Sequence, residues 1–382
     1  MKILHLCLAN FYIDGYNYQE NVLPRINKED GHDVRIIAST ETFIDNQNLG
    51  YVDPSEYVTE FGVPIKRLPY ITVGNHFTTI KLRKYPHLYE EIASFAPDVI
   101  LSHGIAFWSV LDVIRYKKDH PEVKFYADTH TDEKNSGRNW LSMHVLHEGL
   151  YRYLHQRALP YLEKFFYVTA ERKTFSLKHY GMPESILEFY PLGGTILPAE
   201  EYFEKRRIYR EKLGVVGNDT VYVHSGKMDV LKRTEELIRA FSAVDDPQAK
   251  LVILGSMTGE RKSVLMPLME QDSRIVFLGW QPAEELMGYL CACDMYLQPG
   301  SQSATLENAL CCGCAVMSYP HEAYTNGYET SGIRWCETQE DMQRIFQEIA
   351  AGKIELPSLK AKSLSFAKEI LDYKKLASRL YR

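Results

Sequence analysis

The sequence predicts an α/β protein made of two doubly wound, Rossmann-like domains. Short apolar runs alternate with stretches of helical period along the whole chain, which is the pattern of parallel strands joined by crossover helices. The alternation restarts after the midpoint, and a Pro/Gly cluster at residues 190–195 separates the two series. We therefore expect two sheets joined by a linker at this cluster.

The expected elements follow from this alternation. In the first series we expect strands at 3–8, 34–38, 63–68, 99–102, 123–127 and 165–168, and helices around 18–30, 85–95, 105–118 and 142–163. In the second series we expect strands at 221–224, 251–255, 275–278, 295–298 and 315–318. Leu237, Ile238, Phe241 and Val244 recur at the spacing of one helix face between two of these strands.

The linker divides the chain into an N-terminal domain (1–192) and a C-terminal domain (193–363). Residues 364–382 are expected to form an amphipathic helix that packs back on the N-terminal domain. The highly charged stretch 200–212 predicts a solvated surface helix that leads into the second domain.

Composition excludes several classes of protein. The chain has 382 residues, of which 45% are apolar and 25% charged, as in ordinary globular proteins. Its net charge of −6 argues against bulk nucleic acid as the main partner, because such binding depends on neutralising phosphates. The apolar run 3–8 is too short for a signal peptide or a membrane span. We expect a cytoplasmic protein, with a peripheral position at the inner face of the cell membrane as an alternative.

The seven cysteines are odd in number and clustered, which does not suggest a disulfide framework. A zinc site is one interpretation of the cluster formed by Cys291, Cys293, Cys311, Cys312 and Cys314. Buried, reduced thiols are the preferred interpretation, because Cys291 lies on an apolar helix face and Cys311 and Cys312 occupy a small-residue helix end. No metal site is therefore expected.

Two segments of the second domain carry residues suited to an anionic ligand. Gly226 and Lys227 follow a strand, and Lys232 lies just before a helix, so that both lysines can reach one diphosphate. A pair of solvated surface lysines is the alternative. After the strand at 295–298, Ser303 is a suitable N-cap for a helix that begins near Ala304, where free amides bind anions.

Glu307 lies about one turn into this second helix. Its carboxylate is placed to accept hydrogen bonds from a diol such as a ribose. The alternative is a capped helix with a favourable carboxylate in its first turn.

These segments together resemble family 4 glycosyltransferases of the two-domain GT-B fold. The matching pieces are Gly226-Lys227 to Lys232, the strand 251–255, Phe277-Leu278-Gly279-Trp280, and Pro299 to Glu307-Asn308-Ala309, in the family's order and spacing. In that fold the two Rossmann-like domains face each other across a cleft. The resemblance implies that Lys227 and Lys232 hold the donor diphosphate and that Glu307 binds the ribose. It also implies that the segment Ser303, Ala304, Thr305 and Leu306 cradles the phosphates and that Gly279, Trp280 and Gln281 line the base.

Two departures from the family pattern concern the donor. Lys227 stands where the family usually has Arg, which keeps the charge but loses the bidentate fork. The loop before Glu307 is about four residues short and has no acidic residue at the position of the family's first Glu, which usually contacts the donor sugar.

The first domain resembles the family at four segments: 10–16, which contains Gly15, and 31–34, 97–103 and 127–131. The resemblance assigns Gly15 to a glycine loop that faces the donor and Thr131 to donor binding. It makes His130 the candidate catalytic residue, because the family's equivalent histidine faces the donor sugar; the alternative is a structural histidine. His103 is either an acceptor-side residue or part of the packing, and His5 is expected in the core.

The resemblance implies a retaining hexosyltransferase. It would transfer a sugar from a nucleoside diphosphate sugar to a hydroxyl of a glycan or lipid-linked glycan, as in polysaccharide biosynthesis, with neither cofactor nor metal. A GT-B sugar-nucleotide epimerase and a non-catalytic GT-B partner subunit are the alternatives. A basic and aromatic mix in the first domain suggests contact with an anionic membrane surface, and a solvated face is the alternative. The mix comprises Lys66, Arg67, Lys81, Arg83 and Lys84 with Tyr70, Phe77, Tyr85 and Tyr89.

Overall fold

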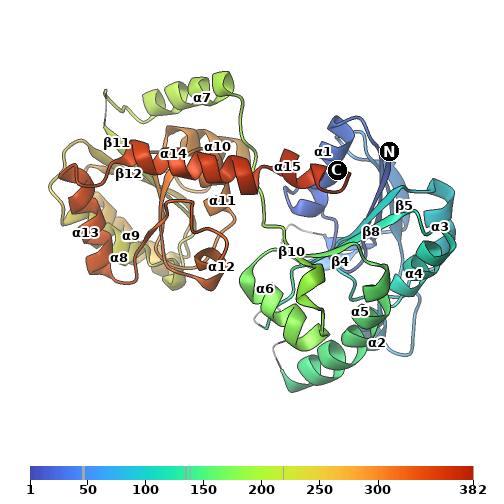
Figure 1. Ribbon diagram of the computed structural model, residues 1–382. Helices are drawn as coiled ribbons and strands as arrows, with labels where there is room; N and C mark the ends of the chain where they lie inside the picture. Colours follow the sequence, from blue (N-terminus) through green and yellow to red (C-terminus); the bar gives the residue numbers. More distant parts are fainter. Residues whose placement is uncertain (45–47, 134–135, 138, 218, 382) are drawn as a thin grey trace. The chain divides into compact units, whose positions relative to one another are not determined.

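The computed structural model describes residues 1–44, 48–133, 136–137, 139–217 and 219–381, and it forms two compact units (Figure 1). Unit 1 comprises Met1–Pro191 and Tyr373–Arg382, and unit 2 comprises Leu192–Asp372. The division falls inside the Pro/Gly cluster at residues 190–195. The segment that returns to unit 1 begins at Tyr373, later than the expected helix boundary at residue 364.

Unit 1 contains an eight-stranded sheet in the order β10-β9-β8-β7-β1-β2-β6-β5. Its strands are β1 (Lys2–Cys7), β2 (Asp33–Ser39), β5 (Ser55–Val58), β6 (Pro64–Leu68), β7 (Val99–Ser102), β8 (Lys124–Thr129), β9 (Lys164–Tyr167) and β10 (Leu187–Phe189). Neighbouring strands are parallel except for β5, which pairs antiparallel with β6. The chain order reverses between β1 and β7. A separate hairpin, β3 (Glu41–Phe43) with β4 (Leu49–Tyr51), follows β2.

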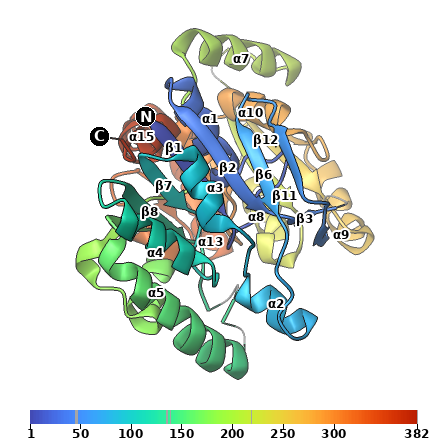
Figure 2. The same cartoon turned by 90° about the vertical axis from the view of Figure 1, so that its right-hand side faces the viewer.

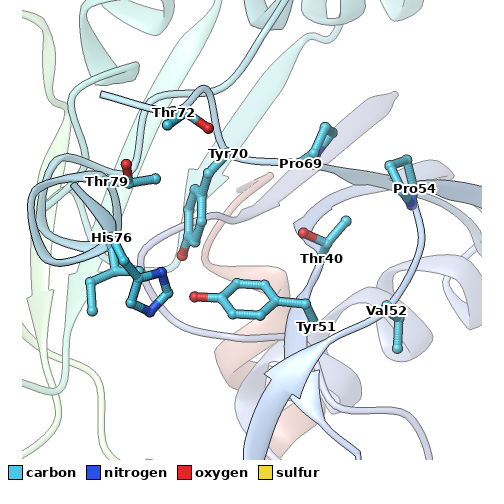
Figure 3. Close-up of a pocket in the computed structure, with 10 residues that line it drawn as sticks. Thr40, Tyr51, Val52, Pro54, Pro69, Tyr70, Thr72, His76 and Thr79 are labelled. Carbon is cyan, nitrogen blue, oxygen red and sulfur yellow. The ribbon is translucent and has the colours of Figure 1, made fainter. Parts of the chain in front are cut away.

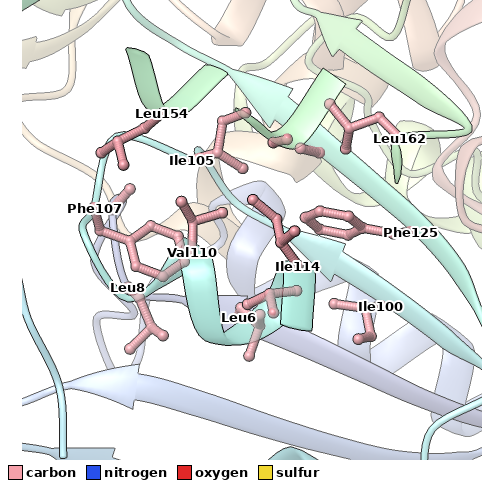
Figure 4. Close-up of a cluster of buried hydrophobic side chains, with 14 of the residues drawn as sticks. Leu6, Leu8, Ile100, Ile105, Phe107, Val110, Ile114, Phe125, Leu154 and Leu162 are labelled. Atoms are coloured by element: carbon pink, nitrogen blue, oxygen red, sulfur yellow. The ribbon is translucent and has the colours of Figure 1, made fainter. Parts of the chain in front are cut away.

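Helices cover both faces of this sheet (Figure 2). They are α1 (Gln19–Glu29), α2 (His76–Leu82), α3 (Leu88–Phe95), α4 (Val110–Asp119), η1 (Ser142–Tyr151), α5 (Arg152–Ala158), η2 (Leu159–Tyr161), α6 (Ala170–Phe175), η3 (Ser176–Tyr180), η4 (Glu184–Ile186) and α15 (Tyr373–Ser378). On one face, Leu6 and Phe125 of the strands lie in one buried cluster with Val110 and Ile114 of α4 (Figure 4). On the other face, α15 buries Leu376 in a cluster with residues of α1.

Unit 2 contains a six-stranded parallel sheet in the order β13-β12-β11-β14-β15-β16. Its strands are β11 (Thr220–Lys227), β12 (Ala249–Ser256), β13 (Ile275–Phe277), β14 (Met295–Gln298), β15 (Ala315–Ser318) and β16 (Arg334–Trp335). Its helices are α7 (Ala199–Lys212), η5 (Val230–Lys232), α8 (Thr234–Ser242), α9 (Gly259–Glu270), α10 (Ala283–Ala292), α11 (Thr305–Cys311), α12 (Glu322–Thr325), α13 (Gln339–Ala350), α14 (Leu356–Phe366) and η6 (Ala367–Leu371). Here the chain order reverses between β11 and β14.

Helix α7 is more than the solvated surface helix expected from its charge. Tyr209 is buried against α10, where a Cβ added to Gly288 would lie 2.1 Å from the Tyr209 Cζ atom. Arg206 and Arg210 form ion pairs with Asp294 at 2.7 and 3.0 Å. Although burial opposes the charge of Asp294, Lys360 and Arg206 lower its pKa to about 2. The charged face of α7 therefore anchors the helix to unit 2.

The seven cysteines are free and buried. Among the residues that the structure describes, no three His, Cys, Asp or Glu side chains are grouped so as to hold a metal ion. Within the same residues, no helix combines the length and the apolar character that a membrane crossing requires.

Candidate functional site

The carboxyl ends of β11 and β14 bring the two segments predicted to bind an anionic ligand to one edge of the sheet of unit 2. In doubly wound sheets ligands bind where the strand order reverses, which here is between these two strands. Strand β11 ends at Gly226-Lys227, and the loop that begins at Pro299 follows β14. The juxtaposition expected from the sequence is therefore present within unit 2.

Two glycines allow these loops to approach closely. A Cβ on Gly300 would lie 2.1 Å from the carbonyl oxygen of Leu231, so the loop after β14 packs directly on the turn of η5. Gly226 has φ +133°, and a Cβ there would lie 2.8 Å from Cε of Lys232. Each glycine therefore leaves room for the η5 segment that carries Lys232.

Lys232 is held between the two loops. Its backbone N–H donates to Oδ1 of Asp229 at 3.1 Å, which caps η5, and its Nζ donates to the carbonyl oxygen of Ser301 at 3.0 Å. The N–H of Ser301 in turn donates to the carbonyl oxygen of Leu231 at 2.8 Å. The side chain is 5% exposed, and burial lowers its pKa. A buried ammonium with spare donors is poised to bind an anion.

Lys227 differs from Lys232 in its surroundings. It is the last residue of β11 and is exposed, whereas Lys232 is buried. Its carbonyl oxygen accepts a hydrogen bond from the N–H of Asp229 at 2.8 Å, so its backbone belongs to the same turn. An exposed ammonium is well hydrated and contributes less to binding per charge than a desolvated one.

Glu307 is buried on α11 and is 4% exposed. The hydroxyl of Tyr328 donates to its Oε1 at 3.2 Å, and Oε2 makes no hydrogen bond with the part of the chain that the structure describes. Burial raises the pKa of this carboxyl group to about 7. The arrangement suits a carboxyl group that accepts hydrogen bonds from a ligand.

The segment before Glu307 differs in detail from the expected helix start. Ala304, not Ser303, is the N-cap, and α11 begins at Thr305. Ser303 lies one residue before this cap, and its hydroxyl accepts a hydrogen bond from the N–H of Thr305 at 3.3 Å. Leu306 is buried and packs into the unit.

Gly279, Trp280 and Gln281 follow β13. The carbonyl oxygen of Gly279 accepts from the N–H of Gly255 at 2.7 Å, which fixes this turn beside the end of β12. Nε2 of Gln281 donates to the carbonyl oxygen of Leu278 at 2.7 Å. The Trp280 ring is 71% exposed, so it is available to a planar ligand such as a base.

In unit 1, His103 lies in the interior, which agrees with the second of its two interpretations, a residue that is part of the packing. Its Nδ1 is 2.7 Å from Oδ2 of Asp128, and its Nε2 is 3.1 Å from Nδ1 of His5. Nε2 of His5, a core residue as expected, is 2.9 Å from Oδ1 of Asn27. His103 is fully buried, with both ring nitrogens engaged.

His5 is neutral in this network, because burial and the neighbouring His103 lower its pKa to about 3. Burial opposes the charge of His103, but the Asp128 carboxylate outweighs it and raises the His103 pKa. Burial likewise opposes the charge of Asp128, yet His103 lowers the Asp128 pKa.

Asp128 is the functional candidate that sequence reasoning missed. Its Oδ1 accepts from the N–H of Gly104 at 3.0 Å and lies 3.8 Å from Nε2 of His130, the candidate catalytic residue. The His130 side chain is 26% exposed, unlike that of His103. The sequence does carry a signal for Asp128. It directly follows the apolar run at 123–127, and a buried carboxylate needs a hydrogen-bonding or charged partner.

The remaining predicted residues of unit 1, Thr131 and Gly15, lie in the loops that follow β8 and β1. Thr131 follows β8, and its N–H donates to Oγ1 of Thr129 at 3.3 Å. Gly15 has φ +75° in the loop after β1, a backbone conformation that favours glycine. The neighbouring Asp14 forms an ion pair with Arg67 at 2.8 Å.

The basic and aromatic mix does not form one surface. Arg67 and Tyr85 are buried at 2% exposure each, and Lys66 pairs with Glu91 at 2.7 Å. Phe77 is 53% exposed, with the Lys81 ammonium 5.7 Å from its ring centre. The exposed members of the mix include Phe77 on α2 and Lys84 just after it.

Comparisons with known proteins agree with this architecture. Residues 205–350, which lie in unit 2, match the family model described as glycosyl transferases group 1. A search among curated protein sequences finds no match. Three similar solved structures each cover nearly the whole chain at 14% identity.

The first is HepE of Anabaena in complex with UDP, which covers 99% of this chain and 98% of its own, with a TM-score of 0.64. The second is the sucrose-phosphate synthase of Thermosynechococcus elongatus (99% and 96%, TM-score 0.62). The third is WaaG, a glycosyltransferase involved in lipopolysaccharide biosynthesis (99% and 99%, TM-score 0.58). The chain therefore has the GT-B fold with two Rossmann-like units. The family match and this fold together support the prediction of a glycosyltransferase enzyme.

Proposed function

We propose that this chain is a retaining glycosyltransferase of the family 4 type, which moves a sugar from a nucleoside diphosphate sugar to a hydroxyl of a glycan or lipid-linked glycan. The observation that carries the proposal is the buried Lys232 ammonium, held between the loops that follow β11 and β14. HepE, which shares the fold, has been solved with UDP and with UDP-glucose, and this likeness supports a nucleotide-sugar donor.

In this proposal Lys232 binds the diphosphate and stabilises the negative charge that grows on it as the glycosidic bond breaks. Because the ammonium is fixed and partly desolvated before the reaction, little reorganisation is needed, and its effect falls on the transition state. Lys227, at the end of β11, adds a solvated positive charge. Of the main-chain amides near Ala304, Thr305 and Leu306, that of Ala304 donates to the phosphates, because those of Thr305 and Leu306 donate to Ser303.

The other donor groups have distinct roles. Glu307 accepts hydrogen bonds from the ribose hydroxyls, and Gly279, Trp280 and Gln281 line the base. His130 orients the donor sugar, and Asp128 positions the His130 ring from 3.8 Å. Gly15 and Thr131 complete the donor contacts of unit 1. The donor is a substrate, and neither a cofactor nor a metal has a role in this proposal.

Acceptor-dependent release of free nucleoside diphosphate tests the activity. A panel of UDP-, ADP- and GDP-sugars is first screened by thermal shift, because a tight ligand raises the apparent stability. The best donor is then incubated with lipid-linked and free glycans. Release only with acceptor supports transfer, epimerised donor without release supports the epimerase, and no donor binding supports a partner subunit. Proton NMR of the product's anomeric configuration tests retention.

A further inference from the structure

Unit 1 contains a pocket of about 310 Å³ at the carboxyl ends of β2 and β6 (Figure 3). Its walls come from the β3–β4 hairpin, from the residues that follow β6, and from α2. The hairpin is fixed to the sheet, because the N–H of Thr40 donates to the carbonyl oxygen of Leu68 and the N–H of Val52 donates to that of Thr40, both at 3.0 Å. The pocket therefore lies within one unit, on backbone that these hydrogen bonds join to the sheet.

Three aromatic rings form a corner in this pocket. The ring centres of Tyr51 and Tyr70 are 6.1 Å apart with an interplanar angle of 77°, and those of Tyr51 and His76 are 6.2 Å apart at 80°. Figure 3 shows the three side chains converging from the hairpin, from the residues after β6 and from α2. Tyr51 remains 47% exposed, so part of its ring surface is open to a ligand. Two nearly perpendicular faces suit a compact ring more than a flat or extended ligand.

Polar atoms surround these rings. The hydroxyl of Tyr70 donates to Oε2 of Glu41 at 2.6 Å, and burial raises the Tyr70 pKa to about 12, so this hydroxyl stays protonated and its oxygen can accept. Thr40 and Thr72 contribute further hydroxyl groups to the wall. The pocket thus offers hydroxyls and an imidazole beside aromatic faces.

The charge of the wall restricts the ligand. Among the residues that the structure describes, those lining the pocket are Thr, Tyr, Val, Pro, His and Ile, with no Asp, Glu, Lys or Arg. No cationic side chain of this lining would pair with a phosphate or carboxylate, and an acyl chain would cover the Thr40 hydroxyl without offering it a hydrogen bond. The volume lies at the lower end of the range for small-molecule sites, which is about 300–1,000 Å³.

We infer that this pocket binds one neutral hexopyranose ring of the acceptor. The inference rests on the proposed function and names the chemistry of its acceptor. The C–H face of the sugar packs on the Tyr51 ring, and its hydroxyls exchange hydrogen bonds with Tyr70, Thr40 and His76. The β3–β4 hairpin, which supplies Tyr51, is then a determinant of acceptor specificity.

Saturation-transfer NMR on the full chain tests the site directly. The probes are the methyl glycosides of glucose, galactose, mannose and N-acetylglucosamine, with inositol, glucose 6-phosphate and methyl glucuronide as comparisons. At least one neutral hexoside should give signals dominated by its ring C–H protons. Tyr51→Ala should weaken that binding about five- to tenfold, and Tyr51→Phe, which keeps the ring, should retain most of it.

Tyr153→Ala is the matched control, because Tyr153 has a similar exposure of 49% and does not line the pocket. It should leave hexoside binding unchanged, and thermal unfolding verifies that each variant is folded. Absence of binding by every neutral hexoside, a preference for the charged sugars, or undiminished binding by Tyr51→Ala overturns the inference. A separate titration with nucleotide sugars tests the proposed function. Donor binding without hexoside binding overturns only the assignment of the pocket. Hexoside binding without donor binding overturns only the proposed function.

Discussion

The hydroxyl of Tyr328 donates a hydrogen bond to Oε1 of Glu307 over 3.2 Å, which leaves Oε2 of this buried carboxyl group without a partner in the described part of the chain. Native proteins satisfy almost all of their buried polar atoms. Burying a carboxyl oxygen without a hydrogen-bond partner lowers the stability of the fold. The arrangement is explained if Oε2 accepts a hydrogen bond from a ligand.

Glu307→Gln should therefore act on donor binding. At pH 8, above its pKa of about 7, the carboxyl group is charged. The substitution then keeps the shape and removes the charge from an acceptor that binds the ribose equally in the ground and transition states, so KM for the donor should rise while kcat changes little. The expected increase in KM is about tenfold or more, since hydrogen bonds to charged groups contribute about 1.5–3 kcal/mol. Steady-state kinetics measure this split. A fall in kcat at unchanged KM would contradict the ribose assignment.

The stability of the protein should depend on the protonation of Glu307. Its pKa of about 7 in the fold lies above the ordinary value of 4.5, so between these pH values the native state binds the extra proton. Stability should consequently fall as the pH rises from about 4.5 to 7, by up to about 3 kcal/mol. Urea unfolding at pH 5 and pH 8 measures the difference. Glu307→Gln should lose this slope, whereas an equal slope in both proteins would show that another group is responsible.

Turnover is expected to be independent of divalent metal ions. Lys232, Lys227 and the loop amides supply positive charge for the diphosphate, and the sequence contains no Asp-x-Asp motif of the kind that holds a metal–nucleotide complex. Activity measured with and without EDTA should agree within error. Activity abolished by EDTA and restored by Mg²⁺ or Mn²⁺ would contradict the assignment.

Most of the parallel strands could be predicted from the sequence because each is a short apolar run between helical stretches. The strands missed were β3, β4, β5, β10 and β16, which have two to four residues each and little apolar pattern. Their existence depends on edge pairing, such as that of β5 with β6, which local sequence does not encode. The pocket was missed for the same reason, because Tyr51 reaches it only through the β3–β4 hairpin.

The environments of the site residues were harder to predict than their positions. Spacing alone treats Lys227 and Lys232 as equivalent, and only the close packing at Gly226 and Gly300 buries one of them. For His103 the sequence left two interpretations open, an acceptor-side residue and a packed one, for a similar reason. Its partners His5 and Asp128 come from strands on either side of it in the sheet, and this pairing appears only in three dimensions.

The His103–Asp128 ion pair should stabilise unit 1 within a defined pH range. The pKa of Asp128 is lowered in the fold, so the stability that its carboxylate contributes is lost as the pH falls below about 4. The pKa of His103 is raised, so the stability that its imidazolium contributes is lost as the pH rises above 6.5, the ordinary pKa of histidine. Asp128→Asn should cost about 3–5 kcal/mol between these limits, because it leaves a buried cation unpaired. Unfolding by urea across pH 3–9, with imidazole NMR of His103, tests this. A neutral His103 at pH 6 in the parent protein would refute the charge assignment.

The two lysines of the donor site should differ in their effects on catalysis. Lys232 is fixed by Ser301 and partly desolvated, so Lys232→Ala removes a charge whose interaction strengthens as the diphosphate departs. Catalytic efficiency should fall by about one to two orders of magnitude or more, mainly in kcat.

Lys227→Ala is the matched control on the exposed side of the same turn, and its loss of catalytic efficiency should be several-fold smaller. Its loss should shrink further at high salt, because solvated charges are screened more strongly than buried ones. Circular dichroism verifies that both variants are folded. If both variants bind the donor and turn over at parental rates, Lys232 does not bind the diphosphate. If Lys227→Ala lowers catalytic efficiency more than Lys232→Ala does, the exposed lysine is the more important of the two for the diphosphate.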